Sequence, residues 1–140
     1  MSQRNASNAK LVLQVLTRLN LGGITDQVLL SSIELRSLGY EVQFVVGKCG
    51  EQEHDCTPEI VANGFTVHRI DQLSNCVGLL ADVVVFLKLL KLFNSKRPHW
   101  VHLHMFKARV LGALAARLVG IPAIIETLHG HLLEGHFNKL

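Results

Sequence analysis

Short apolar runs alternate with longer segments of helical periodicity along almost the whole chain, and this alternation constrains the fold more than any single motif. The runs are rich in Leu, Val and Ile and end at Gly, Pro or polar residues, which is typical of buried strands. Strands are expected at 11–16, 41–46, 65–70, 99–103 and 123–128, with helices at 24–38, 57–63, 76–93 and 107–119. This pattern predicts an α/β fold: an open, Rossmann-like parallel sheet of about five strands in the order 3-2-1-4-5, with helices on both faces.

The chain has the length of one ordinary domain, and no linker divides it. Its 140 residues are 49% apolar, which suffices for a core. Residues 1–9 are polar and are predicted to be flexible, so the domain is expected to span 10–140. The start lacks the apolar stretch of a secretory signal. The three cysteines (Cys49, Cys56 and Cys76) are expected to be reduced in a cytoplasmic protein, with a Cys49–Cys56 bridge as the alternative.

The charge and the most apolar segment bear on partners. A formal charge of +3 from scattered basic residues argues against nucleic acid. It allows a mild attraction to anionic lipid headgroups, and hence a peripheral position at the inner face of a membrane. The run at 76–93 contains Asp82, Lys88 and Lys91, which are expensive in hydrocarbon. We therefore expect a helix packed on the sheet, with an interfacial membrane helix as the alternative. Its predicted buried face consists of Leu79, Val83, Phe86, Leu87 and Leu90.

Ligands of open parallel sheets bind beyond the carboxyl ends of the strands, above all where the strand order reverses. This rule selects four loops as candidates, at 19–23, 47–56, 104–107 and 129–136. The first and fourth strands are neighbours in the expected order. The glycine loop after the first strand should therefore face the histidines that follow the fourth strand.

Gly22 and Gly23 join the first strand to the first helix. Glycines let the backbone approach a ligand closely, and the free amides of a helix's first turn attract anions, so a diphosphate group would suit this loop. The dinucleotide fingerprint GxGxxG and the P-loop lysine pattern are both absent. A tight strand-to-helix turn is the alternative interpretation.

Histidines cluster late in the chain. In "VHLH", His102 and His104 lie on the same face of a strand because side chains alternate. With His129 and His131 they could form a zinc site of the kind found in some hydrolases. The "HGH" segment lies on a turn, however, and has none of the fixed geometry of HExxH, so no metal is expected. A structural role for a buried His102 is the alternative.

Other catalytic arrangements find little support. There is no GxSxG elbow for a nucleophilic serine. Glu126 lies within a strand and Glu134 stands alone in the last loop, so no carboxylate pair for glycoside hydrolysis is evident. Lys107, just after the fourth strand, is either a phosphate ligand or a solvated lysine at a helix start.

Three segments together resemble the N-terminal domain of family 4 glycosyltransferases of GT-B architecture. They are "LVLQVLTRLNLGGITDQVLLSSIELRSLGYEVQFVVG", "RPHWVHLHMFKARVLGALAARLVGIP" and "TLHGH", and the resemblance extends from residue 10 to about 137. It implies one half of a GT-B fold, in which two Rossmann-like domains face each other. The N-terminal domain mostly holds the acceptor, and the C-terminal domain holds the nucleotide-sugar.

The resemblance also implies residue roles. Gly22 and Gly23 would approach the donor diphosphate, and His129 would be the catalytic-site residue that reaches the hydroxyls of the donor sugar. The acceptor side would comprise Asn20, His104, Lys107, His131 and Glu134. Family members of this kind transfer with retention and need neither a metal nor a cofactor. Where relatives often carry a small hydroxyl residue and a glycine around the lysine, this chain has Phe106 and Arg109.

The resemblance leaves two hypotheses. Because the C-terminal donor-binding domain is absent from the sequence, the chain is expected to be the acceptor-side half of a sugar transferase, truncated or completed by a separately encoded domain. It would act on a glycan or lipid-linked acceptor and would bind the nucleotide-sugar only with that second half. The alternative is a non-catalytic remnant or binding module with the same fold. A zinc hydrolase that uses the HxH histidines is a minor alternative.

Overall fold

The computed structural model describes residues 9–74 and 78–129. In this part of the chain, five parallel strands form one sheet in the order β3-β2-β1-β4-β5, as the sequence predicted. The elements in chain order are β1 (Leu11–Leu16), α1 (Gly23–Ser37), β2 (Glu41–Val46), α2 (Thr57–Ala62), β3 (Thr66–Arg69), α3 (Leu79–Lys96), β4 (Trp100–His104), α4 (Phe106–Val119) and β5 (Ala123–Thr127).

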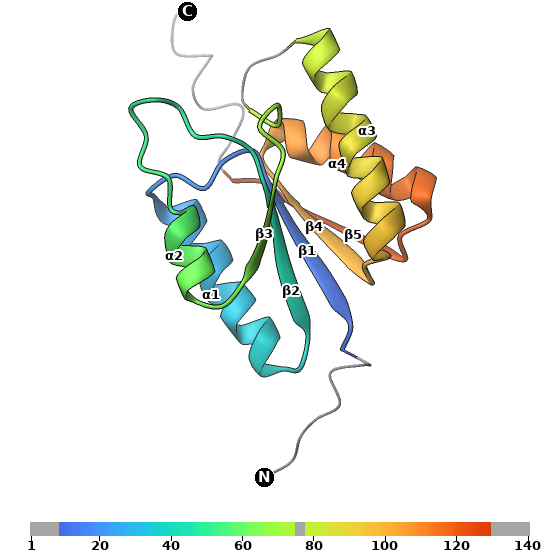
Figure 1. Cartoon of the computed structure of the whole chain (residues 1–140). Helices are drawn as coiled ribbons and strands as arrows, with labels where there is room; N and C mark the ends of the chain where they lie inside the picture. Colours follow the sequence, from blue (N-terminus) through green and yellow to red (C-terminus); the bar gives the residue numbers. More distant parts are fainter. Residues whose placement is uncertain (1–8, 75–77, 130–140) are drawn as a thin grey trace, which may run out of the picture.

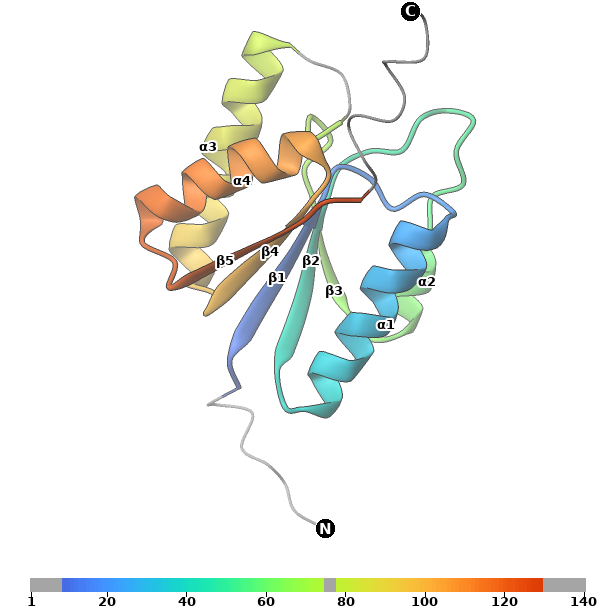
Figure 2. The same ribbon diagram turned by 180° about the vertical axis from the view of Figure 1, so that it is seen from behind.

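Helices cover both faces of the sheet. Figures 1 and 2 show the sheet nearly edge-on, with α1 and α2 on one side and α3 and α4 on the other. Alternation along β1 divides its side chains between the two sides. Leu13 and Val15 pack with Phe93 under α3 and α4, whereas Val12 and Leu16 pack under α1 and α2. The predicted fold class is therefore confirmed.

Local signals explain the element boundaries. Every residue of β1 is buried, as expected for a central parallel strand that is covered on both faces. Pro58 lies in the first turn of α2, where its missing amide hydrogen is not needed. Gly120 ends α4 in the left-handed conformation with φ 77°, a role that glycine fills without strain.

The predicted buried face of α3 is only partly right: Phe86 and Leu90 pack against the core, but the most buried residues of the helix are others. The helix turns Val85, Leu89 and Phe93 into the core, all 0% exposed, while Leu79 and Leu87 are 81% and 55% exposed. The helix is apolar on nearly all sides, so periodicity alone did not identify the side that faces the sheet. Among the described helices, none is both long and apolar enough to cross a bilayer.

The cysteine prediction holds for the described residues. Cys49 and Cys56 are free thiols, so the alternative bridge between them is not formed. Burial raises the pKa of both thiols, which keeps them in the unreactive protonated form. Cys76 lies outside the described residues, as does nearly all of the segment 1–9 that was predicted to be flexible.

Candidate functional site

The candidate site lies at the carboxyl edge of the sheet, where β1, β4 and β5 end side by side. β1 pairs with β4, and β4 pairs with β5 up to the contact of His104 with Thr127. The loops that follow these three strands contain the glycines and histidines that the sequence singled out. The sheet order thus gathers residues from distant parts of the chain, as the strand-order rule predicted.

Five polar side chains are joined by three hydrogen bonds and by contacts between their histidine rings. His104 Nε2 lies 2.8 Å from Gln14 Oε1, and His104 Nδ1 lies 2.9 Å from His129 Nε2. The ring of His104 stacks on that of His129 at a centroid distance of 5.1 Å, and the ring of His102 lies tilted against it at a centroid distance of 4.0 Å. His102 Nε2 in turn lies 2.6 Å from Thr127 Oγ1. The predicted placement of His102 and His104 on one face is confirmed.

Burial determines the charge state of these rings. His104 is 2% exposed, and burial, followed by the neighbouring rings of His102 and His129, lowers its pKa to about 3. Burial also lowers the pKa of His102 and of His129. A buried imidazolium without a carboxylate partner is unfavourable, so the three rings are neutral near pH 7.

The protein should become less stable as the pH falls below 6.5. Folded His104 stays neutral down to about pH 3, whereas in the unfolded chain its pKa returns to the ordinary histidine value of 6.5. The unfolded state therefore binds more protons in this interval, and the free energy of unfolding falls by up to about 1.4 kcal/mol per pH unit. Urea unfolding at pH 7 and pH 5 measures this slope. His104→Gln should flatten it and the exposed control His54→Gln should not; equal slopes in all three proteins would refute the assignment.

The glycine loop leaves open space beside its backbone. Gly22 has φ 158° and ψ 172°, a region that suits glycine, and α1 begins without a side-chain cap. A Cβ atom added to Gly22 or Gly23 would meet nothing within 4 Å. Crowding within the described chain therefore does not account for the two glycines, and the first-turn amides of α1 have no side-chain acceptor there.

Asn20 ties the glycine loop to the loop at 47–56. Its side-chain amide donates to Glu53 at 3.3 Å, and its carbonyl accepts a hydrogen bond from Thr25 Oγ1 at 2.6 Å. Its backbone forms an isolated bridge with Asp55. In this arrangement Asn20 positions the loop.

Lys107 is buried, with its charge paired across two helices. The Lys107 ammonium lies 2.6 Å from Asp82 Oδ1 of α3, and the side chain is 9% exposed. Arg109, one of the two departures from the family pattern, pairs with Glu126 of β5 at 3.1 Å. Phe106, the other departure, is 67% exposed at the start of α4. The sequence alone proposed Lys107 as a phosphate ligand or a solvated lysine; the solvated alternative is wrong, because the side chain is buried between α3 and α4 and paired with Asp82.

One group of side chains in the described part of the chain has metal-ligand character. Ligand atoms of His54, Cys56 and Glu59 lie within 4.8 Å of one another. The exposed side chains of His54 and Glu59 are hydrogen-bonded at 2.9 Å, which accounts for their proximity without a metal. At the HxH segment, both ring nitrogens of His104 are engaged by other side chains. His131 and Glu134 lie outside the described residues.

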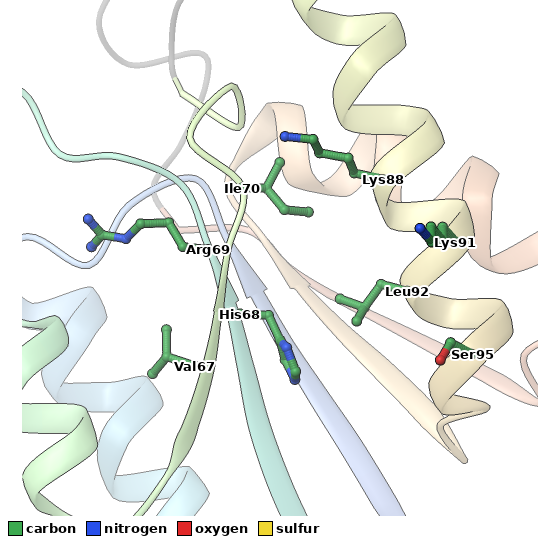
Figure 3. Close-up of a pocket in the computed structure, with 8 residues that line it drawn as sticks. All are labelled: Val67, His68, Arg69, Ile70, Lys88, Lys91, Leu92 and Ser95. Carbon is green, nitrogen blue, oxygen red and sulfur yellow. The ribbon is translucent and has the colours of Figure 1, made fainter.

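A cavity of about 500 Å³ lies elsewhere, between β3 and α3. Figure 3 shows Lys88 and Lys91 on α3 and His68 on β3 around it, with Arg69 turned away towards the opposite side of the strand. The Lys88 ammonium donates to Gln72 at 2.9 Å. β3 is the edge strand farthest from β5, so this basic cavity is separate from the histidine cluster.

Sequence reasoning missed two features of the site. Gln14, the polar member of "LVLQVL", is 0% exposed and is the partner of His104. A glutamine inside a fully buried strand was itself the available signal, since buried polar groups need partners. Met105, between β4 and α4, adopts φ 65°, which is uncommon for a residue other than glycine. Nothing in the sequence indicated that strained turn.

Fold and site together define a Rossmann-like domain whose candidate ligand site is built from the loops after β1, β4 and β5. Residues 22–139, most of the chain, match the family described as the glycosyl transferase 4-like domain. The chain therefore belongs to this family, as its resemblance to the N-terminal domain of family 4 glycosyltransferases predicted.

One curated protein resembles part of this chain in sequence, and two solved structures share its fold. The UDP-Gal:alpha-D-GlcNAc-diphosphoundecaprenol alpha-1,3-galactosyltransferase of Escherichia coli is 34% identical over 70 residues, which are 50% of this chain and 18% of that protein. MurG from Acinetobacter baumannii superposes with a TM-score of 0.64 at 18% identity, over 87% of this chain and 37% of that chain. A UDP-N-acetylglucosamine 2-epimerase gives 0.64 at 16% identity, over 89% and 34%. The chain thus spans only a minor part of each of these proteins.

Proposed function

We propose that this domain is the acceptor-side half of a glycosyltransferase that transfers a sugar from a nucleotide-sugar to a glycan or lipid-linked acceptor. The family match over residues 22–139 carries this proposal. The fold by itself does not, because an epimerase and MurG share it equally well. A C-terminal donor-binding domain, on the same or a separate chain, would complete the enzyme.

The proposed roles follow the loops at the carboxyl edge. The open backbone of Gly22 and Gly23 receives the donor diphosphate when the two domains close. His129 contacts a hydroxyl of the donor sugar. His131 and Glu134 face the acceptor. Asn20, His104 and Lys107 support these loops from behind through the contacts described above. Transfer proceeds with retention and without a metal, and the configuration of the product bond, measured by NMR, tests the stereochemistry.

The isolated chain should bind nucleotide-sugars weakly or not at all. A few backbone hydrogen bonds and a helix dipole supply about 1–3 kcal/mol, whereas millimolar binding already requires about 4 kcal/mol. Isothermal titration with uridine and guanosine diphosphate sugars measures this affinity. Micromolar binding by the chain alone would show that the donor site has been misplaced. Adding a donor-binding domain should restore binding and transfer; a remnant or pure binding module would show no transfer.

We further propose that the start of α3 contacts a membrane surface peripherally, at its inner face. Leu79, Leu80 and Leu87 are 81%, 84% and 55% exposed, and Lys88 and Lys91 follow on the same helix. Exposed apolar side chains next to lysines suit an interface with anionic lipid. The name of the Escherichia coli relative contains a diphosphoundecaprenol-linked substrate, and a lipid-linked acceptor of this kind supports the proposal.

Removing the apolar side chains should weaken membrane binding. The triple variant Leu79→Ser, Leu80→Ser, Leu87→Ser is expected to lose at least about 10-fold in affinity for phosphatidylglycerol vesicles, because each leucine buried in lipid contributes more than about 1 kcal/mol. Vesicle sedimentation measures the change. The control variant Leu30→Ser, Leu38→Ser removes one leucine of α1 and the leucine that directly follows the helix, which are 64% and 72% exposed, and it should bind as the wild type does. Equal binding by the two variants would contradict the α3 surface.

A further inference from the structure

The hydrogen bonds around His104 connect three strands in one line. Gln14 lies in the middle of β1, His104 is the last residue of β4, and His129 follows β5 by two residues. The nitrogens of His104 face Gln14 Oε1 at 2.8 Å on one side and His129 Nε2 at 2.9 Å on the other. The position of each proton along this line determines which nitrogen of His129 is left to meet a ligand.

His104 is neutral and fully engaged. It is 2% exposed, and its lowered pKa keeps it uncharged at neutral pH. A neutral imidazole carries one donor nitrogen and one acceptor nitrogen. Both nitrogens of His104 have partners, so it cannot change its tautomer without changing the roles of both neighbours.

Gln14 fixes which nitrogen of His104 donates. Its amide presents Oε1 to the ring, and a carbonyl oxygen can only accept. His104 Nε2 therefore carries the proton and His104 Nδ1 has the lone pair. Because Nδ1 faces His129 Nε2 at hydrogen-bond distance, His129 Nε2 must be the donor. In neutral His129, the remaining nitrogen, Nδ1, is then an acceptor.

We propose that Gln14 and His104 are positioning residues that hold His129 in the Nε2–H tautomer and so present Nδ1 as a hydrogen-bond acceptor to the ligand. An acceptor nitrogen receives a hydrogen bond from a hydroxyl group but repels a phosphate oxygen, which is itself an acceptor. This inference rests on the proposed function for the identity of the ligand. It restricts His129 to the sugar hydroxyls of the donor and leaves the diphosphate to the glycine loop.

The proton positions can be observed in the intact chain without any ligand. At pH 7.5, nitrogen-15 NMR of the histidine rings should show a scalar coupling across the hydrogen bond, with the proton attached to His129 Nε2 and with His104 Nδ1 as the acceptor. The opposite amide orientation of Gln14 would place the proton on His104 Nδ1. Observing the proton there, or no coupling between the two rings, would overturn the proposal.

Variants separate positioning from mere packing. Gln14→Leu removes the carbonyl that fixes the tautomer of His104, so His129 should lose its single tautomer and the coupling should disappear. Gln43→Leu removes the amide from a matched pair far from the site, where Gln43 Oε1 lies 2.7 Å from His68 Nε2. It should leave the coupling intact. An unchanged coupling in Gln14→Leu would refute the role of Gln14. If that variant does not fold, the position of the proton in the wild-type spectrum still tests the proposed tautomer of His129.

Failure of the proposed function gives a different result. Suppose that the coupling is observed but that no sugar is transferred after a donor-binding domain is added. The proposed tautomer of His129 would then stand, and the proposed transferase activity would be disproved. An active enzyme without the coupling would support the transferase and disprove the tautomer control. In an active enzyme, Gln14→Leu should lower kcat by about 10-fold, roughly the effect of one weakened hydrogen bond, and Gln43→Leu should not.

Discussion

Gly47→Ala is expected to prevent folding or to lower the free energy of unfolding by more than about 4 kcal/mol. Gly47 is buried directly after β2. A Cβ atom there would lie 1.6 Å from the carbonyl oxygen of Leu73 and 2.2 Å from that of Thr17. Both obstacles are backbone atoms, so no side chain can rotate away. The loops after β1, β2 and β3 would have to separate, which breaks the edge where the candidate site lies.

Circular dichroism during urea unfolding measures this effect. Gly23→Ala is the matched control, because an added Cβ meets nothing within 4 Å at that position. Alanine also favours a helix start over glycine by a few tenths of a kcal/mol or more, so this variant should be as stable as the wild type or slightly more stable. If both variants unfold at the same urea concentration as the wild type, the close approach of the three loops is incorrect.

His129→Ala should lower kcat by about 100-fold in an active enzyme that contains this domain. The reason is the loss of a preorganised hydrogen bond at the reacting sugar, and losses of this kind typically amount to about 100- to 1,000-fold. The ring is held in advance by His104 at 2.9 Å, so it need not reorganise during the reaction. KM for the acceptor should change much less, because His129 is proposed to contact the donor.

Steady-state kinetics with both substrates varied separates these two effects. His68→Ala is a suitable control, because His68 lies on β3 at the opposite edge of the sheet and pairs with Gln43. It should keep kcat within a few-fold of the wild type. A His129→Ala enzyme with unchanged kcat and a raised KM for the acceptor would place His129 on the acceptor side.

Most of the architecture could be predicted because its signals are local. The period of the apolar residues changes at Gly22 and Gly120, and these positions bound helices in the structure. The right-handedness of crossover connections between parallel strands, together with their shortness, then left few strand orders to consider. The boundaries of β1 and β2 match the expectation, whereas β4 is shifted by one residue, to Trp100–His104.

The environment of the site residues could not be predicted in this way. A lysine after a strand looks the same whether it is solvated or paired, and the partner of Lys107 is Asp82 of another helix. Likewise, the contact between Gln14 and His104 joins residues 90 positions apart. Such pairings depend on how distant elements pack, and a single sequence carries no local signal for them.

The central position of β1 also governs how the chain must fold. β1 pairs with β2 on one side. Its other edge pairs with β4, in which Trp100 lies opposite Val12, so this edge stays unpaired until β4 has joined the sheet. Bringing together segments so far apart in sequence slows folding and lengthens the time during which a strand edge stays open. On a ribosome, β1 would remain half-paired until β4 had emerged. An apolar strand left open in this way is a hazard for aggregation, so we expect the yield of folded protein to depend on chaperones that bind the nascent chain before residue 104 is made.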